Sequence, residues 1–297
     1  MGHLPIGETA ALAAAALWAG TSILWTRQMA VSWPQAMNLF KTALCFPLFL
    51  LVLLLFGPRP ALAGVGAGSF AILFVSGVAG MSLGDSAYFA ALGRIGATRT
   101  MLIQTLTPLF AAALSAAFGQ PLPGRLAAVG VAFVVAGLAL VLRERPHGTI
   151  VRGKVISGLA FALLAAFCQA LGIVLTKLGL EEADVLQAST IRIFAGVLGV
   201  LLFSLLRGRL AATVSHAIRP PSLRRILPAA LLGSFVGFFL FQVAVRYADP
   251  AITAALTGTS PLFVAPLSAV FLGETMKPAG WIGTILAVLG VALVMSG

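Results

Sequence analysis

Charged residues are scarce in this chain, and acidic residues are the scarcest. Of its 297 residues only 9% are charged, and only 8 are Asp or Glu. A soluble globular domain carries roughly 25% charged residues, so this chain has too few to cover a surface that faces water. Because 60% of its residues are hydrophobic, the apolar excess must face lipid. The composition excludes an ordinary soluble protein and predicts an integral membrane protein.

Cysteine and histidine are also rare. Cys45 and Cys168 lie in separate apolar runs, where a free thiol behaves as a small hydrophobe. The three histidines are far apart in the chain and show no metal-ligand spacing. There is no GxSxG or HExxH motif, and the GxxxxGK match at 148–154 is followed by Val155 instead of a magnesium-binding Ser or Thr. We therefore predict no metal, no cofactor and no enzymatic activity.

Positive charge is in excess, since 19 Lys and Arg residues give a formal net charge of +11. These residues are not gathered into a basic domain, so we expect no nucleic-acid partner. They stand in short gaps between apolar runs, where Lys and Arg normally fix membrane topology. Their distribution predicts that both termini lie outside the cytoplasm. The N-terminal residues lack the features of a signal peptide, so we expect the first apolar run to be retained as a helix.

Ten apolar runs are long enough to cross a bilayer, which takes roughly 20 residues. The fold class predicted is therefore an all-α membrane protein with ten transmembrane helices. Two polar gaps are longer than the others, at 143–153 and 207–225, and the first divides the chain in half. The predicted helices lie near 8–26, 36–56, 70–92, 97–118, 124–142, 153–177, 186–206, 226–246, 250–272 and 279–296.

The two halves of the chain resemble each other. Thr-Pro-Leu-Phe at 107–110 returns as Ser-Pro-Leu-Phe at 260–263, which is 153 residues later. We therefore predict two five-helix repeats, at 1–146 and 147–297. Because five is odd, the second repeat enters the membrane from the opposite face, and inverted repeats form a midplane cleft that opens alternately to each side. Further pairs at or near this offset are Gly80 with Gly233, Gly84 with Gly237, Tyr88 with Phe241, and Lys41 with Arg192.

Three charged residues fall at membrane depth. Placing such a charge in the bilayer costs on the order of several kcal/mol unless it is paired or hydrated, so each is a candidate for function. Asp85 is the main acid in the predicted spans, and it is a candidate proton carrier, an anchor for a substrate amine, or half of an ion pair with Lys41 or Arg94. Lys41 and Arg192 hold matching positions, and facing a cavity they would attract a carboxylate or a phosphate.

Uncharged polar and aromatic residues complete the set of candidates. A buried amide needs hydrogen-bond partners, which either another helix or a substrate can supply. Glutamines within the predicted spans are Gln104, Gln169 and Gln242. Aromatic residues that could line an apolar pocket are Trp18, Tyr88, Phe89, Phe238 and Phe241.

Several motifs together resemble those of a known family. These motifs are Leu-Trp-Ala-Gly at 17–20, the basic residues Arg27 and Lys41, Pro-Leu-Phe at 108–110 and 261–263, and Gly-Glu at 273–274. On them the chain resembles, over essentially its whole length, the drug/metabolite transporter superfamily in its ten-helix EamA-type branch. Within that branch it is similar to the YddG-type amino-acid exporters.

The resemblance implies secondary transport by alternating access in a bacterial inner membrane, with the lipid bilayer and a small-molecule substrate as partners. It implies a central cavity between helices 1–4 and 6–9, with helices 5 and 10 at the periphery or at a dimer contact, so the protein would be a monomer or a homodimer. The family's termini are cytoplasmic, opposite to the charge count. The cavity candidates are Trp18, Asp85, Tyr88, Gln104, Gln169, Arg192 and Gln242.

We expect the chain to move small organic metabolites and, within that class, to export amino acids. One alternative is exchange of phosphorylated metabolites, with Lys41 and Arg192 as the anion site. The other alternative is a scaffold or lipid scramblase that transports no solute.

Overall fold

The computed structural model describes residues 6–59, 61–117, 155–219, 223–247 and 278–296, together with scattered positions in 125–140 and 256–270. All regular structure among these residues is helical, which confirms the all-α prediction. In the described part, six helices are long and apolar enough to cross a membrane. The predicted spans at 124–142 and 250–272 fall largely outside the described residues, so the count of ten stays a prediction.

The first half of the chain forms a series of helices that matches the first four predicted spans. The second helix begins at a proline, whose fixed φ suits the first turn and whose missing N–H is not needed there. The helices are α1 (Ile6–Met29), α2 (Pro34–Phe56), α3 (Ala67–Gly77), the π-helix η1 (Val78–Gly84), α4 (Asp85–Gln104) and α5 (Thr107–Ala117).

A glycine separates the third span from the fourth inside α4. Gly96 has φ 79° and ψ 172°, a conformation that only glycine adopts readily. The residues before it continue α3 and η1 as one span, and the residues after it continue into α5. The predicted spans at 70–92 and 97–118 are therefore separated at this break.

The second half forms α7 (Val155–Gly179), α8 (Val185–Leu206), α9 (Leu210–Ile218), α10 (Leu223–Pro228), the π-helix η2 (Ala229–Gly237), α11 (Phe238–Tyr247) and α14 (Pro278–Ser296). The sequence did not predict α9, which lies in the polar gap at 207–225. Thr213 and Ala217 are buried and Val214 packs on the core, so one face of α9 covers α2. Its nine residues are too few for a search by membrane thickness to detect.

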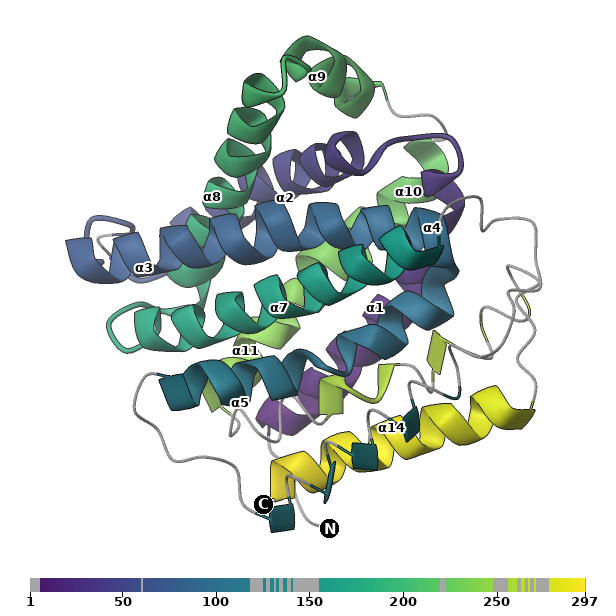
Figure 1. Cartoon of the computed structure of the whole chain (residues 1–297). Helices are drawn as coiled ribbons and strands as arrows, with labels where there is room; N and C mark the ends of the chain where they lie inside the picture. Colours follow the sequence, from purple (N-terminus) through teal and green to yellow (C-terminus); the bar gives the residue numbers. More distant parts are fainter. Residues whose placement is uncertain are drawn as a thin grey trace.

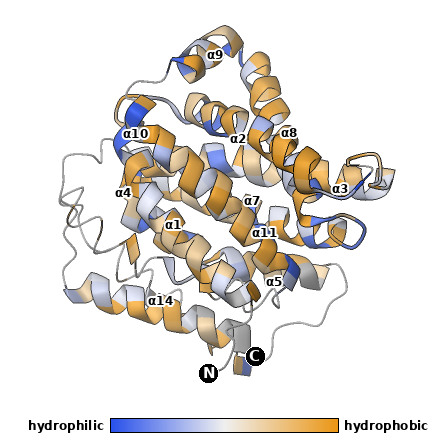
Figure 2. Ribbon diagram, turned by 180° about the vertical axis from the view of Figure 1, so that it is seen from behind, coloured by the Kyte–Doolittle hydropathy of each residue, from blue (hydrophilic) through white to orange (hydrophobic). Residues whose placement is uncertain are grey.

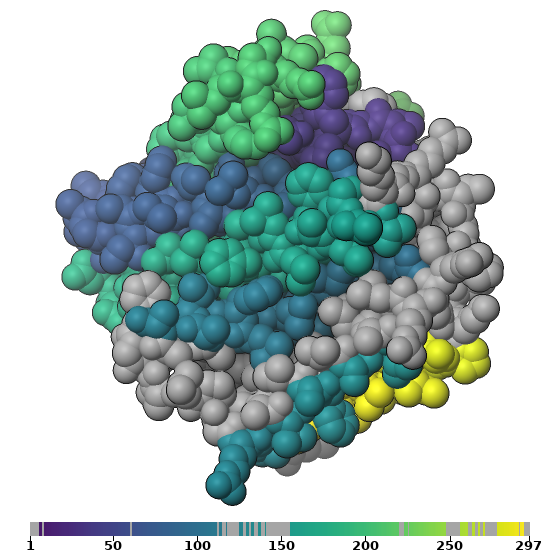
Figure 3. Space-filling model, viewed as in Figure 1, coloured from purple at the N-terminus to yellow at the C-terminus, as the bar shows by residue number. Residues whose placement is uncertain are grey.

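The repeat seen in the sequence has a structural counterpart. Both halves carry a π-helix, and η1 and η2 end at Gly84 and Gly237, which stand 153 residues apart. Each π-helix packs against the other half, η1 on α7 and η2 on α1. Figure 1 shows the long helices of both halves interleaved, and in Figure 3 the bands of α3 and α7 adjoin on one face.

The outer faces of the helices are apolar. Figure 2 shows hydrophobic colouring along most of the length of the helices. Leucines at the ends of two spans are largely exposed, for example Leu55 at 62% and Leu206 at 77%. Surfaces of this kind are costly in water and suited to lipid, as expected for a membrane protein.

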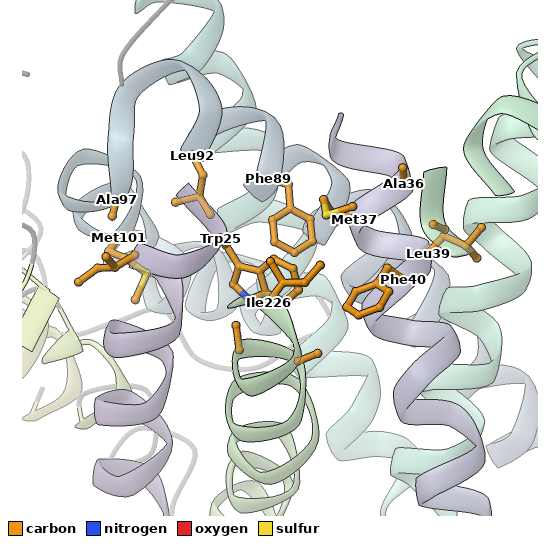
Figure 4. Close-up of a cluster of buried hydrophobic side chains, with 14 of the residues drawn as sticks. Trp25, Ala36, Met37, Leu39, Phe40, Phe89, Leu92, Ala97, Met101 and Ile226 are labelled. Carbon is orange, nitrogen blue, oxygen red and sulfur yellow. The ribbon is translucent and has the colours of Figure 1, made fainter. Parts of the chain in front are cut away.

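A cluster of buried apolar side chains joins helices of both halves of the chain (Figure 4). Trp25 of α1 packs on Phe89 of α4 with ring centroids 5.0 Å apart. Phe40 of α2 and Ile226 of α10 belong to the same cluster. Trp25 and Phe89 also border the central cavity, so this cluster packs directly against it.

Candidate functional site

A cavity of about 190 Å³ lies between the two halves of the chain. The first half contributes lining residues from α1, α2, η1, α4 and α5, and the second half from α7, α8, η2 and α11. Among the predicted site residues, Gln242 does not line the cavity and lies fully buried behind Arg192. The other eight line it: Trp18, Lys41, Asp85, Tyr88, Gln104, Gln169, Arg192 and Phe241. That these residues bind substrate stays a prediction.

The acid of the cavity is Asp85, which stands where η1 passes into α4. Its Oδ2 forms an ion pair with Lys41 Nζ of α2, and its Oδ1 accepts a hydrogen bond from Gln169 Nε2 at 3.0 Å. Asp85 and Lys41 are 8% and 7% exposed, so either charge alone would be buried without a counterion, which is strongly destabilising. The other partner considered, Arg94, instead donates to the Ala90 carbonyl at 2.8 Å.

The second cation, Arg192 of α8, has no such partner among the described residues. The residue is 2% exposed, and its guanidinium lies 5.3 Å from the Phe238 ring centroid and donates to Gln242 Oε1 at 2.8 Å. Its Nε makes no hydrogen bond, and no ion pair of Arg192 is found in the part of the chain that the structure describes. The described lining thus holds two cations and one carboxylate.

Gln169 and Gly80 lie between Asp85 and Arg192. A Cβ on Gly80 would stand 3.2 Å from Arg192 Nη2 and 3.7 Å from Gln169 Oε1. Gln169 donates to Asp85 from the other end of the same amide. A glycine at position 80 therefore leaves room for the guanidinium beside the partners of Asp85.

Aromatic side chains form the apolar wall of the cavity. Trp18 and Phe241 have ring centroids 5.1 Å apart, and Trp18 Nε1 donates to the Gly233 carbonyl of η2 at 3.0 Å. Tyr88 Oη donates to Met101 Sδ at 3.1 Å. A cavity with a few polar groups set in aromatic walls is typical of small-molecule sites.

The sequence analysis missed one residue that positions Asp85. Asn38 of α2 is fully buried and its Nδ2 contacts the carbonyls of Met81 and Ser82 at 2.8 and 3.1 Å, and Ser86 Oγ at 2.9 Å. These contacts hold the end of η1, from which Asp85 enters the cavity. The signal available was an amide three residues before Lys41 in the same predicted span.

Within the described ranges, no three His, Cys, Asp or Glu side chains come together in a way that could hold a metal ion.

Comparison with solved structures supports the fold. One structure, titled "Crystal structure of protein", aligns with 97% of this chain and 95% of its own at a TM-score of 0.62 and 20% identity. At that identity the likeness concerns the fold alone.

Comparisons with curated proteins find transporters. The chain is 29% identical over 125 residues to the uncharacterized transporter YdfC of Bacillus subtilis, covering 41% of this chain and 38% of YdfC. It is 32% identical over 139 residues to the pseudopaline exporter CntI of Pseudomonas aeruginosa, covering 47% and 46%. An uncharacterized transporter of Archaeoglobus fulgidus is 25% identical over 225 residues, or 75% of each chain. The matches to YdfC and CntI thus span less than half of those proteins.

The family match covers both halves of the chain. The EamA-like transporter family matches residues 5–143 and again residues 156–296. Together with the apolar helices, this shows that the chain belongs to the EamA-like transporter family and is a multi-pass membrane protein.

Proposed function

We propose that the protein is a secondary transporter that exports amino acids across a bacterial inner membrane by alternating access. The observation that carries the proposal is a cavity shared by both halves, with buried charges of both signs in aromatic walls. A site of this kind suits a small polar metabolite that also carries an apolar part. One relative, CntI of Pseudomonas aeruginosa, is a pseudopaline exporter, which supports export as the direction.

The position of the cavity suits alternating access. Two apolar clusters adjoin it, one containing Trp25 and Phe89 and the other containing Leu73, Ile191 and Phe241. Rocking one half against the other would open one cluster while the other stays closed. Such motion moves the cargo past the bilayer without exposing a continuous pore.

The test is solute flux in proteoliposomes loaded with labelled amino acids. We expect flux to fall more than about tenfold in Arg192→Gln, because a charge-assisted contact contributes roughly 1.5–3 kcal/mol. Lys177→Gln is the matched control, since Lys177 is an exposed cation at the end of α7, and its flux should stay near that of the unsubstituted protein. Absence of flux for every amino acid from folded protein would overturn the proposal, and lipid scrambling without solute flux would favour a scramblase.

Exchange of phosphorylated metabolites is the second candidate function. It is favoured by the charge of the described lining, where Lys41 and Arg192 outnumber the single carboxylate of Asp85. Uptake of a labelled sugar phosphate that Lys41→Gln and Arg192→Gln both abolish, with no amino-acid flux, would establish this function instead.

A further inference from the structure

We propose that the cavity recognises its cargo by two charged ends, with Arg192 receiving a carboxylate and Asp85 receiving an ammonium group. The proposal rests on the proposed amino-acid transport and specifies its substrate class. It implies selection of zwitterionic amino acids over molecules that carry only one of the two charged groups.

Arg192 offers more donors than its described surroundings accept. A guanidinium carries five N–H donors, and among the described residues Gln242 Oε1 is the side-chain acceptor that it meets. The Nε atom is buried with no partner, and the whole residue is 2% exposed. A carboxylate binds an arginine about twice as strongly as a neutral acceptor does and often with two parallel bonds. A cargo carboxylate would therefore supply the countercharge that Gln242 does not.

Asp85 is able to accept one more donor. Its oxygens each have one partner, Gln169 and Lys41, whereas a carboxylate offers about four acceptor sites. Asp85 already binds one primary ammonium group, that of Lys41. An amino acid carries a group of the same kind. The free acceptor sites of Asp85 thus offer a place for an ammonium group. The buried Oε1 of Gln104, which has no hydrogen-bond partner among the described residues, is a second acceptor on the cavity lining.

The two ends of this site are close enough for one small molecule. Gln169 contacts Asp85 with its nitrogen, and its oxygen stands near the same point beside Gly80 as Arg192 Nη2 does. In an α-amino acid the carboxylate and the ammonium are carried by one carbon, so such a molecule brings both charges to neighbouring points of the cavity. The side chain of the cargo would then lie against Trp18 and Phe241, which line the cavity.

A matched set of three probes tests the proposal by calorimetric titration of the purified protein. The probes are L-leucine, 4-methylpentanoate, which lacks the amine, and 3-methylbutylamine, which lacks the carboxylate. We expect each analogue to bind at least about tenfold more weakly than leucine, as loss of one charge-assisted contact implies. Arg192→Gln should bring leucine down to the affinity of 3-methylbutylamine, while Lys177→Gln keeps the preference of the unsubstituted protein.

The ammonium end needs a variant that keeps the fold, because Asp85→Asn alone leaves Lys41 buried without its counterion. The double variant Lys41→Met with Asp85→Asn removes both charges, and we expect it to bind leucine no better than 4-methylpentanoate. Leucine flux with equal affinity for all three probes would overturn the two-ended site while leaving amino-acid transport intact. Absence of both leucine binding and leucine flux would overturn this inference together with the proposed function for this amino acid.

Discussion

The two cations of the cavity occupy equivalent positions in the two halves but have different surroundings. Lys41 pairs with the carboxylate of Asp85 and lies 5.7 Å from the ring centroid of Phe89, one helical turn further on. Its counterpart Arg192 is placed differently. Arg192 lies over the ring of Phe238, which occupies the position equivalent to Asp85. It donates a hydrogen bond to the amide of Gln242, which occupies the position equivalent to Phe89.

The exchange follows directly from the repeat offset. Phe238 stands 153 residues after Asp85, and Gln242 stands 153 residues after Phe89. Arg192 contacts both of these side chains. The two halves therefore use the same two helix positions, one turn apart, but in opposite order. The first half has a polar residue followed by an aromatic one, and the second half has an aromatic residue followed by a polar one. Symmetry places the two cations, and the exchange leaves only the second without a described countercharge.

The largest expected effect tests whether the first cation depends on its partner. Asp85→Asn leaves the Lys41 ammonium uncompensated at 7% exposure, which costs about 3–5 kcal/mol of unfolding free energy for a broken buried pair. Gln242→Leu removes a neutral acceptor from Arg192 and should cost less, about 1–3 kcal/mol. Denaturant titration in detergent measures both.

The double variant Lys41→Met with Asp85→Asn is the control for this prediction. It should recover most of the lost stability because no lone charge remains buried. If Asp85→Asn and Gln242→Leu cost the same, the contrast between the two cations would be wrong.

A smaller effect separates the two equivalent glycines of the π-helices. A Cβ on Gly233 would stand 2.4 Å from Thr21 Oγ1 and 3.0 Å from Thr21 Cβ, so Gly233→Ala should cost about 1–3 kcal/mol through overpacking. A Cβ on Gly80 would stand 3.2 Å from the end of the flexible Arg192 side chain, with its other neighbours at 3.7 Å or more. Gly80→Ala should therefore keep its thermal midpoint yet bind leucine more weakly. Equal midpoints for the two variants would contradict this difference.

The smallest expected effect comes from a substitution that gives the first half the residue found in the second half. A Cβ on Gly20 would meet nothing within 4 Å, and the residue 150 positions later, near the repeat offset, is the buried Ala170. Gly20→Ala should raise the unfolding free energy by about 0.5–1 kcal/mol, because alanine loses less backbone freedom in a helix. A lower thermal midpoint for this variant would show that position 20 needs its glycine.

Much of the fold could be predicted from the sequence, because apolar length and a constant offset are properties of the chain alone. The break near Gly96 separated two predicted spans, and Lys41 and Arg192 were paired by position before the cavity was seen. The partner of Asp85 was not decided in this way. Lys41 and Arg94 were both available, and the choice depends on how α2 faces η1, which hydrophobic runs do not encode.

The polar contacts behind the site were also beyond the sequence. Asn38 holds carbonyls at the end of η1, and a π-helix leaves no periodicity in a run that is apolar on every side. Helix α9 was missed for a related reason, because a short amphipathic helix inside a polar connection resembles a loop when only long apolar runs are sought.

Whether Asp85 faces the cavity depends on the number of residues in the π-helix η1 as well as on their identity. Wider turns accommodate an extra residue relative to an α-helix, and the direction of each later side chain includes that extra step. Deleting one codon between 78 and 84 would turn the residues after it by about 100°, the rotation per residue of an α-helix. Asp85 would then leave Lys41 although no charged residue had been lost. A deletion that an alignment would score as minor would remove the acid from the cavity as effectively as its substitution.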